Sequence, residues 1–103
     1  MININIVKKD DVVCSVIATG HSREGKRAQH ICNGVSALMY TLVLSLKEVN
    51  KVGISVIDDK EGMSVEILKG YHKKEVQIIL NTIICGLRGI SNLYPQNVKI
   101  RSN

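Results

Sequence analysis

Apolar and polar residues alternate at the start of the chain. Residues 2–6 alternate isoleucine with asparagine, and this period of two is typical of a strand that buries one face. Two aspartates at positions 10 and 11 favour a turn, and a second strand is predicted over about residues 12–19, after which Gly20 follows. The sequence therefore predicts a hairpin in this first part of the chain.

Two later segments show the three- and four-residue spacing of amphipathic helices. The first helix is predicted from residue 31 to about residue 48, and the second from about residue 73 to residue 93, shortly before Pro95. Residues 20–30, which precede the first helix, are polar, contain glycine and lack periodicity, so we expect a loop there.

A second hairpin is predicted between the two helices. Residues 52–57 and 63–68 flank a polar turn, in which Gly62 suits a position of positive φ. Residues 97–101 can add a short final strand. The order β-β-α-β-β-α predicts an α+β fold in a single domain, residues 1–103, with a mainly antiparallel sheet of four to five strands and two helices packed on one face.

The composition indicates a small domain with an aliphatic core. The chain has 103 residues, 45% of them hydrophobic, with 26 Ile and Val residues and neither Phe nor Trp. Its longest apolar runs are far shorter than the roughly 20 residues of a membrane-spanning helix. Its alternating start lacks the apolar region of a signal peptide. We therefore expect a cytoplasmic protein that has no membrane partner.

The net charge of +5 is compatible with a nucleic-acid partner but does not identify one. The basic residues are scattered, apart from the segment 23–27 and a pair at 73–74, and the chain has no nucleic-acid-binding motif. Arg23, Lys26 and Arg27 are most simply part of a solvated loop, with steering of a substrate as the alternative. Direct RNA binding is therefore not expected to be the main function.

The three cysteines do not form a recognisable framework. Cys14, Cys32 and Cys85 are odd in number and far apart in the sequence, so neither a disulfide scaffold nor a metal or redox motif is indicated. No cofactor and no metal are expected. Cys14 lies in the middle of a predicted strand and Cys85 within the apolar second helix, so both are predicted to be small core residues.

Cys32 is a candidate nucleophile because it lies in the predicted first turn of a helix. Unpaired backbone N–H groups and the helix dipole stabilise a thiolate there, and the same N–H groups can hold an oxyanion. His21, directly after a strand and a glycine, is the candidate base, with His30 and His72 as alternatives. Taken alone, Cys32 is also explained as a small buried hydrophobe.

Gly34 and Ser36 follow Cys32 inside the predicted helix. Gly34 is explained by close packing of the helix, or alternatively by room for a substrate backbone beside Cys32. In the second interpretation, Ser36 and Gly34 shape the substrate groove.

These motifs resemble those of the ribosomal-processing cysteine protease family Prp. The chain has Gly20-His21-Ser22 and, eleven positions after the histidine, Cys32-Asn33-Gly34-Val35-Ser36-Ala37, close to a family pattern of Gly-His-Ala/Ser followed by Cys-Ala-x-x-Ser-Ala. The resemblance extends over the whole length. It implies a homodimeric cysteine endopeptidase with Cys32 as nucleophile and His21 as base. It also implies a substrate, namely a large-subunit ribosomal protein that loses a short N-terminal extension.

The chain departs from the family pattern at Gln29. Members usually have an aspartate three residues before the cysteine, and that carboxylate can cap the helix or orient the histidine. The Gln29 amide can form a hydrogen bond but carries no charge to stabilise an imidazolium. The alternative function is therefore a catalytically weakened module that binds a ribosomal protein or RNA.

Overall fold

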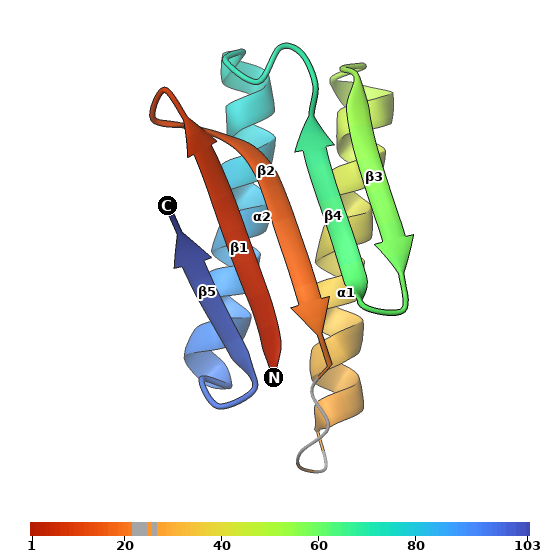
Figure 1. Cartoon of the computed structure of the whole chain (residues 1–103), viewed down its shortest axis with the longest axis vertical. Helices are drawn as coiled ribbons and strands as arrows, with labels where there is room; N and C mark the ends of the chain where they lie inside the picture. Colours follow the sequence, from red (N-terminus) through yellow and green to blue (C-terminus); the bar gives the residue numbers. More distant parts are fainter. Residues whose placement is uncertain (22–24, 26) are drawn as a thin grey trace.

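The computed structural model of the protein describes residues 1–21, 25 and 27–103. Eight elements follow one another along the chain (Figure 1). In chain order they are β1 (Ile2–Lys9), β2 (Val12–Gly20), α1 (Ala28–Leu44), the π-helical turn η1 (Ser45–Val49), β3 (Ile54–Asp59), β4 (Gly62–Ile67), α2 (Lys74–Leu93) and β5 (Val98–Ser102).

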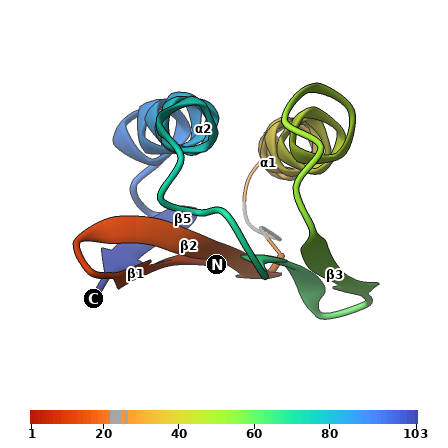
Figure 2. The ribbon, with the colours of Figure 1, turned by 90° about the horizontal axis from the view of Figure 1, so that it is seen from above.

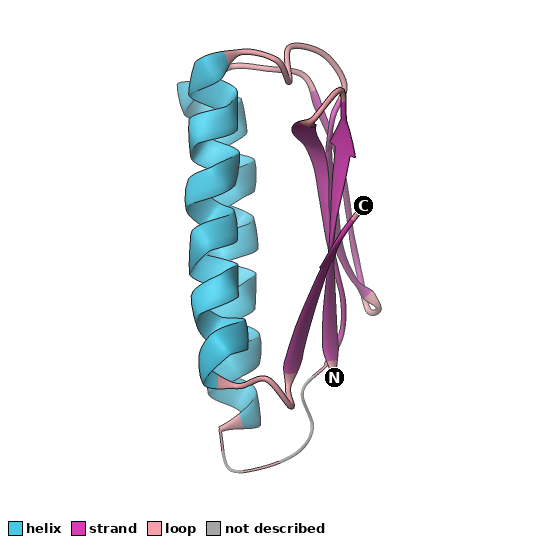
Figure 3. Ribbon diagram, turned by 90° about the vertical axis from the view of Figure 1, so that its left-hand side faces the viewer, coloured by secondary structure: helices cyan, strands magenta, loops and turns pink. Residues whose placement is uncertain are grey.

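The strands form a single sheet in the order β3-β4-β2-β1-β5. The pairs β1–β2, β2–β4 and β3–β4 are antiparallel, and β5 runs parallel to β1. Both helices lie side by side on one face of this sheet (Figure 2), so the molecule has two layers (Figure 3). The predicted α+β fold, including the optional fifth strand, is confirmed.

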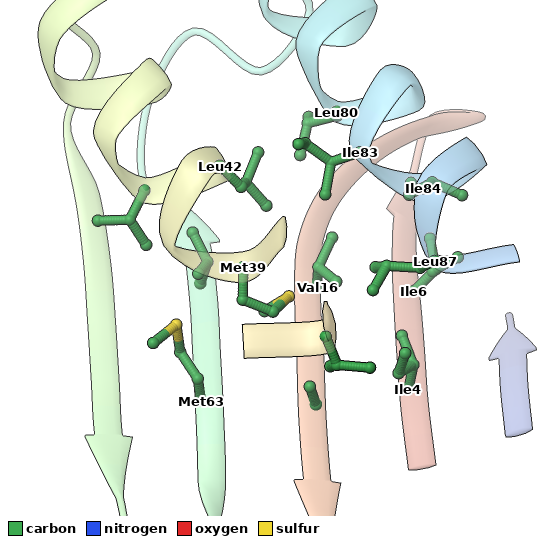
Figure 4. Close-up of a cluster of buried hydrophobic side chains, with 14 of the residues drawn as sticks. Ile4, Ile6, Val16, Met39, Leu42, Met63, Leu80, Ile83, Ile84 and Leu87 are labelled. Atoms are coloured by element: carbon green, nitrogen blue, oxygen red, sulfur yellow. The ribbon is translucent and has the colours of Figure 1, made fainter. Parts of the chain in front are cut away.

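The core lies between the sheet and the helices and is almost entirely aliphatic (Figure 4). The isoleucines of β1 point toward the helices, and the asparagines between them lie on the other face, as the period of two predicts. Each helix contributes a buried stripe at the predicted spacing. The buried helix residues are Ile31, Val35, Met39, Leu42 and Val43 of α1 and Val76, Leu80, Ile83, Ile84 and Leu87 of α2.

Two local predictions are wrong. Helix α1 begins at Ala28, three residues earlier than predicted, because the polar start of the helix is read as loop in the sequence. Cys32 is therefore the fifth helical residue and lies in the second turn. Cys85 is exposed, because it lies off the buried stripe of α2, which passes through Ile84 and Leu87. Cys14 is buried as predicted, and its thiol lies 3.5 Å from the Val7 carbonyl oxygen.

Helix α2 is long and apolar enough, by length and composition alone, to cross a membrane. Its packing gives another reason for that composition. Its five buried residues form one stripe, and α2 packs against β2, β5 and α1, while exposed residues such as Asn81 and Thr82 lie between the buried ones. An amphipathic helix that covers a sheet has this distribution.

Candidate functional site

The end of β2 and the start of α1 lie at the same end of the molecule (Figure 1). A cavity of about 140 Å³ is lined by residues from this end. His21 and Cys32 both line it, although they come from the loop after β2 and from α1. The turn between β3 and β4 reaches the same end, because Thr19 of β2 pairs with Gly62 of β4. The cavity thus joins three segments that are distant in sequence.

The backbone around His21 is held by contacts to the chain start. The ammonium group of Met1 donates to the His21 carbonyl oxygen at 2.8 Å. Gly20, just before it, has φ +86°, and a Cβ atom there would overlap the Met1 carbonyl oxygen. Glycine is therefore required at this position on two grounds, left-handed backbone and close approach of another strand.

The His21 ring forms a hydrogen bond with the turn between β3 and β4. Its Nε2 atom lies 3.0 Å from the carbonyl oxygen of Lys60. That turn is closed by Asp59, whose Oδ1 accepts hydrogen bonds from the backbone amides of Glu61 at 2.9 Å and Gly62 at 3.2 Å. This arrangement is an Asx turn, in which a side-chain carboxylate replaces a backbone acceptor.

Cys32 is half-buried and lies on the face of α1 that lines the cavity. Ser36 and Tyr40 follow it at intervals of four residues and line the same cavity. At the start of the helix, the backbone amide of Ile31 donates to the Arg27 carbonyl oxygen at 3.0 Å and the amide of Ala28 to the Gly25 carbonyl oxygen at 3.4 Å. Helical side chains lean toward the N-terminus of their helix, so the Cys32 thiol is expected to lie over this first turn.

The cavity has an apolar floor and an acidic wall. Buried side chains form the floor; they are Ile2, Ala18, Val35, Met39 and Met63. Asp58 and Asp59 line the wall, and Tyr40 donates a hydrogen bond of 2.5 Å to the Asp58 carboxylate. That hydrogen bond, together with the negative charge of Asp58, raises the pKa of Tyr40 above its usual value.

The structure brings together four of the residues assigned to the site from sequence. Gly20, His21, Cys32 and Ser36 all line the cavity. Gly34 lies elsewhere, since a Cβ atom there would stand 3.3 Å from Ile90 of α2, which favours close helix packing as its explanation.

Gln29 does not contact the His21 ring; its amide donates to Asn33 of the same helix at 3.0 Å. Arg27 is exposed, as expected of a solvated residue, and its guanidinium donates a hydrogen bond to the Tyr94 hydroxyl at 3.4 Å. The expectations for Ser22, Arg23 and Lys26 concern positions outside the described residues.

Neither alternative histidine replaces His21. His30 is exposed on the first turn of α1, and His72 lies 3.7 Å from Asp10 at the loop between β1 and β2. Neither is among the residues that line the cavity. Within the described residues, no group of three or more His, Cys, Asp or Glu side chains is arranged to hold a metal ion.

The sequence analysis did not assign Tyr40, Asp58 or Asp59 to the site. The available signal is the strand register rather than a motif. Once β2 is paired antiparallel with β4, the turn that precedes Gly62 must lie beside the residues that follow Thr19.

Three solved structures have the same fold over nearly their whole length. The chain is 23% identical to the essential ribosomal processing protease Prp from S. aureus in complex with a covalently linked product peptide, with a TM-score of 0.86 and 100% of both chains covered. The complex of that protease with a substrate peptide gives 22% identity, a TM-score of 0.90 and the same coverage. SMU.848 from Streptococcus mutans gives 21% identity and a TM-score of 0.91, covering 99% of this chain and 96% of that one. No curated protein matches the chain.

The family comparison covers the site as well as the fold. The family model of the cysteine protease Prp matches residues 1–99, a range that includes every residue of the cavity described above. The resemblance that the sequence motifs indicate is therefore confirmed. The chain belongs to the Prp family of cysteine proteases.

Proposed function

We propose that this protein is a cytoplasmic cysteine endopeptidase that removes a short N-terminal extension from a large-subunit ribosomal protein. The observation that carries the proposal is that His21 and Cys32 line the same cavity. Membership of the Prp family supports it, as do the peptide complexes of the S. aureus protease with the same fold.

The proposed reaction uses Cys32 as nucleophile and His21 as general base. His21 takes the thiol proton, and the thiolate attacks the scissile carbonyl carbon to form a C–S bond. Collapse of the tetrahedral intermediate breaks the C–N bond, and the imidazolium returns its proton to the leaving amine. Water then hydrolyses the thioester, which releases the N-terminal fragment as a carboxylic acid and regenerates the thiol.

The cavity supplies the remaining groups. The apolar floor takes an apolar side chain of the peptide next to the scissile bond. The Ser36 hydroxyl, one helical turn after Cys32, donates to the oxyanion together with the amides of the first turn of α1. The sequence predicts Cys32 in the first turn of the helix, but because the helix begins at Ala28, Cys32 lies in the second turn.

The direct test is cleavage of a peptide that spans the extension junction of the host's own ribosomal protein, followed by mass spectrometry. We expect the wild-type protein to cut it, and Cys32→Ala and His21→Ala to lose cleavage while remaining folded. Cys85→Ala is the matched control, because that thiol is exposed and is not among the residues that line the cavity, and it should cut normally. Undiminished cleavage by Cys32→Ala would refute the mechanism.

The same assay separates the protease from a binding module. A wild-type protein that binds the peptide without cutting it would support the non-catalytic alternative. Thiol alkylation at pH 7 gives a second readout, since an ordinary thiol with a pKa of about 8.5 is then mostly protonated. We expect Cys32 to react faster than the more exposed Cys85; slower reaction at Cys32 would count against an activated nucleophile.

The proposal includes a homodimer. Several large apolar side chains are exposed, including Leu44 of α1 at 54% and Ile78 of α2 at 55%, and association would cover part of this surface. Light scattering coupled to size-exclusion chromatography should give twice the 11.4 kDa mass of the chain. A monomer at all concentrations tested would remove this part of the proposal.

A further inference from the structure

The His21 ring is oriented by a backbone carbonyl rather than by a carboxylate. Its Nε2 atom lies 3.0 Å from the Lys60 carbonyl oxygen, in the turn that Asp59 closes. We infer that this carbonyl fixes the tautomer and direction of the His21 imidazole, and that Asp59 is a positioning residue that acts through the turn. The inference rests on the proposed function, in which His21 is the base.

The tautomer follows from the chemistry of the two partners. A carbonyl oxygen only accepts hydrogen bonds, so Nε2 must carry the hydrogen and donate it to Lys60. In the neutral ring, Nδ1 is then the nitrogen with a free lone pair, and it is the atom that takes the Cys32 proton. After that transfer Nε2–H still donates to the carbonyl dipole, so the imidazolium keeps its orientation and its hydrogen bond.

The position of the Lys60 carbonyl is set by contacts on both sides of the turn. Asp59 Oδ1 accepts from two successive backbone amides, those of Glu61 and Gly62. The Gly20 amide donates to the Glu61 carbonyl oxygen at 2.9 Å, which ties the turn to the residue directly before His21. Gly62 lies so close to β2 that a Cβ atom there would overlap the Ala18 carbonyl oxygen. The turn is therefore tied to β2 directly before His21.

Two roles for Asp59 lead to different expectations. If Asp59 acts through the Asx turn, Asp59→Asn should preserve its role, because the amide Oδ1 accepts the same two hydrogen bonds without a charge. If Asp59 acts through its negative charge on the imidazolium, asparagine fails as completely as alanine does. The pair Asp59→Asn and Asp59→Ala therefore isolates the hydrogen-bonded turn from the carboxylate charge.

The first experiment reads the tautomer directly, by ¹⁵N NMR of the imidazole nitrogens in the full-length protein above the pKa of free histidine, about 6.5. His30 is exposed and serves as the internal reference for a solvated ring, and His21→Gln assigns the His21 signals. We expect His21 to show a wholly protonated Nε2 and a pyridine-type Nδ1, displaced from the tautomer mixture of His30. Asp59→Ala should move the His21 shifts toward those of His30, and Asp59→Asn should leave them in place.

The second experiment measures peptide cleavage by the same variants. We expect Asp59→Ala to lower kcat/KM about 10- to 100-fold, a part of the roughly 10² to 10⁴ that a positioned general base contributes. Asp59→Asn should stay within about threefold of the wild type, and circular dichroism checks that each variant folds. If Asp59→Ala does not fold, the wild-type shifts and the Asp59→Asn activity still decide the question.

Three results would overturn the inference. They are a protonated Nδ1 in wild-type His21, shifts of His21 equal to those of His30, and loss of activity in Asp59→Asn as large as in Asp59→Ala. None of them affects the proposed protease, which depends on Cys32 and His21 and fails only if those residues are dispensable for cleavage.

Discussion

Gly20 is the position at which a single methyl group should disturb the site most clearly. Gly20→Ala introduces two costs. The left-handed backbone at φ +86° costs an L-residue about 1–2 kcal/mol. The new Cβ would also overlap the Met1 carbonyl oxygen, well inside the 3.0 Å that Cβ atoms keep from their neighbours. Met1 must move away, which breaks its 2.8 Å hydrogen bond to the His21 carbonyl and costs about a further 1 kcal/mol.

Gly25 offers a matched control for this substitution. Its φ of +88° is nearly the same, but among the described residues no atom lies within 4 Å of a Cβ atom placed there. Gly25→Ala should therefore carry the backbone cost alone, about 1–2 kcal/mol, against about 2–3 kcal/mol for Gly20→Ala. Urea denaturation measures the free energy of unfolding, and a 1 kcal/mol difference also shifts Tm by about 4–8 °C in a domain of this size.

Gly20→Ala and Gly25→Ala should differ more in cleavage activity than in stability. Gly20→Ala displaces the backbone that carries His21, so cleavage should fall even at temperatures where the variant is fully folded. Equal unfolding free energies for the two variants would refute the role assigned to the Met1 contact. Normal cleavage by Gly20→Ala would show that the site tolerates that displacement.

Three further predictions test other parts of the structure. Asp58→Asn should lower the raised pKa of Tyr40 toward its usual value, which ultraviolet titration of the phenol measures. Because the pKa of Tyr40 is raised in the folded protein, the interaction with Asp58 stabilises the fold fully below about pH 10. That stabilisation is lost as the pH rises through the folded pKa. Asp11→Gly should stabilise the protein by about 0.5–1 kcal/mol, since Asp11 has φ +64° in the turn between β1 and β2; an unchanged urea midpoint would contradict this. Leu42→Ala should cost about 2–5 kcal/mol because Leu42 is 0% exposed in the core, and a cost below 1 kcal/mol would contradict the packing described.

The sequence predicts the elements well because the two periods are strong and local. Alternation in β1 and the three- and four-residue spacing in α1 and α2 each follow from burial of one face, so they survive in the sequence alone. The start of α1 is missed because Ala28, Gln29 and His30 contribute no buried side chain that would extend the stripe. The prediction for Cys85 fails because an apolar helix is not buried on every side.

The site is predicted in part, for a similar reason. Cys32 and His21 are assigned to the site from local motifs, that is, from the residues next to each of them in the sequence. The contribution of Asp59 and of the Lys60 carbonyl depends on the pairing of β2 with β4, which joins residues about 40 positions apart. A backbone carbonyl leaves no signature in the side-chain sequence at all. Such a partner becomes visible only when the register is known.

The position of β3 at one edge of the sheet links the proposed activity to a peripheral part of the fold. β3 pairs with β4 alone, whereas β2 and β1 each have two strand neighbours. Local opening of a peripheral hairpin needs less free energy than global unfolding, and amide hydrogen exchange detects it. Since Asp58, Asp59 and the Lys60 carbonyl all belong to this hairpin, warming should abolish cleavage several degrees before the aliphatic core melts. The working temperature range of the protein is then set by the edge of the sheet, where β3 pairs with β4 alone, rather than by its well-packed centre.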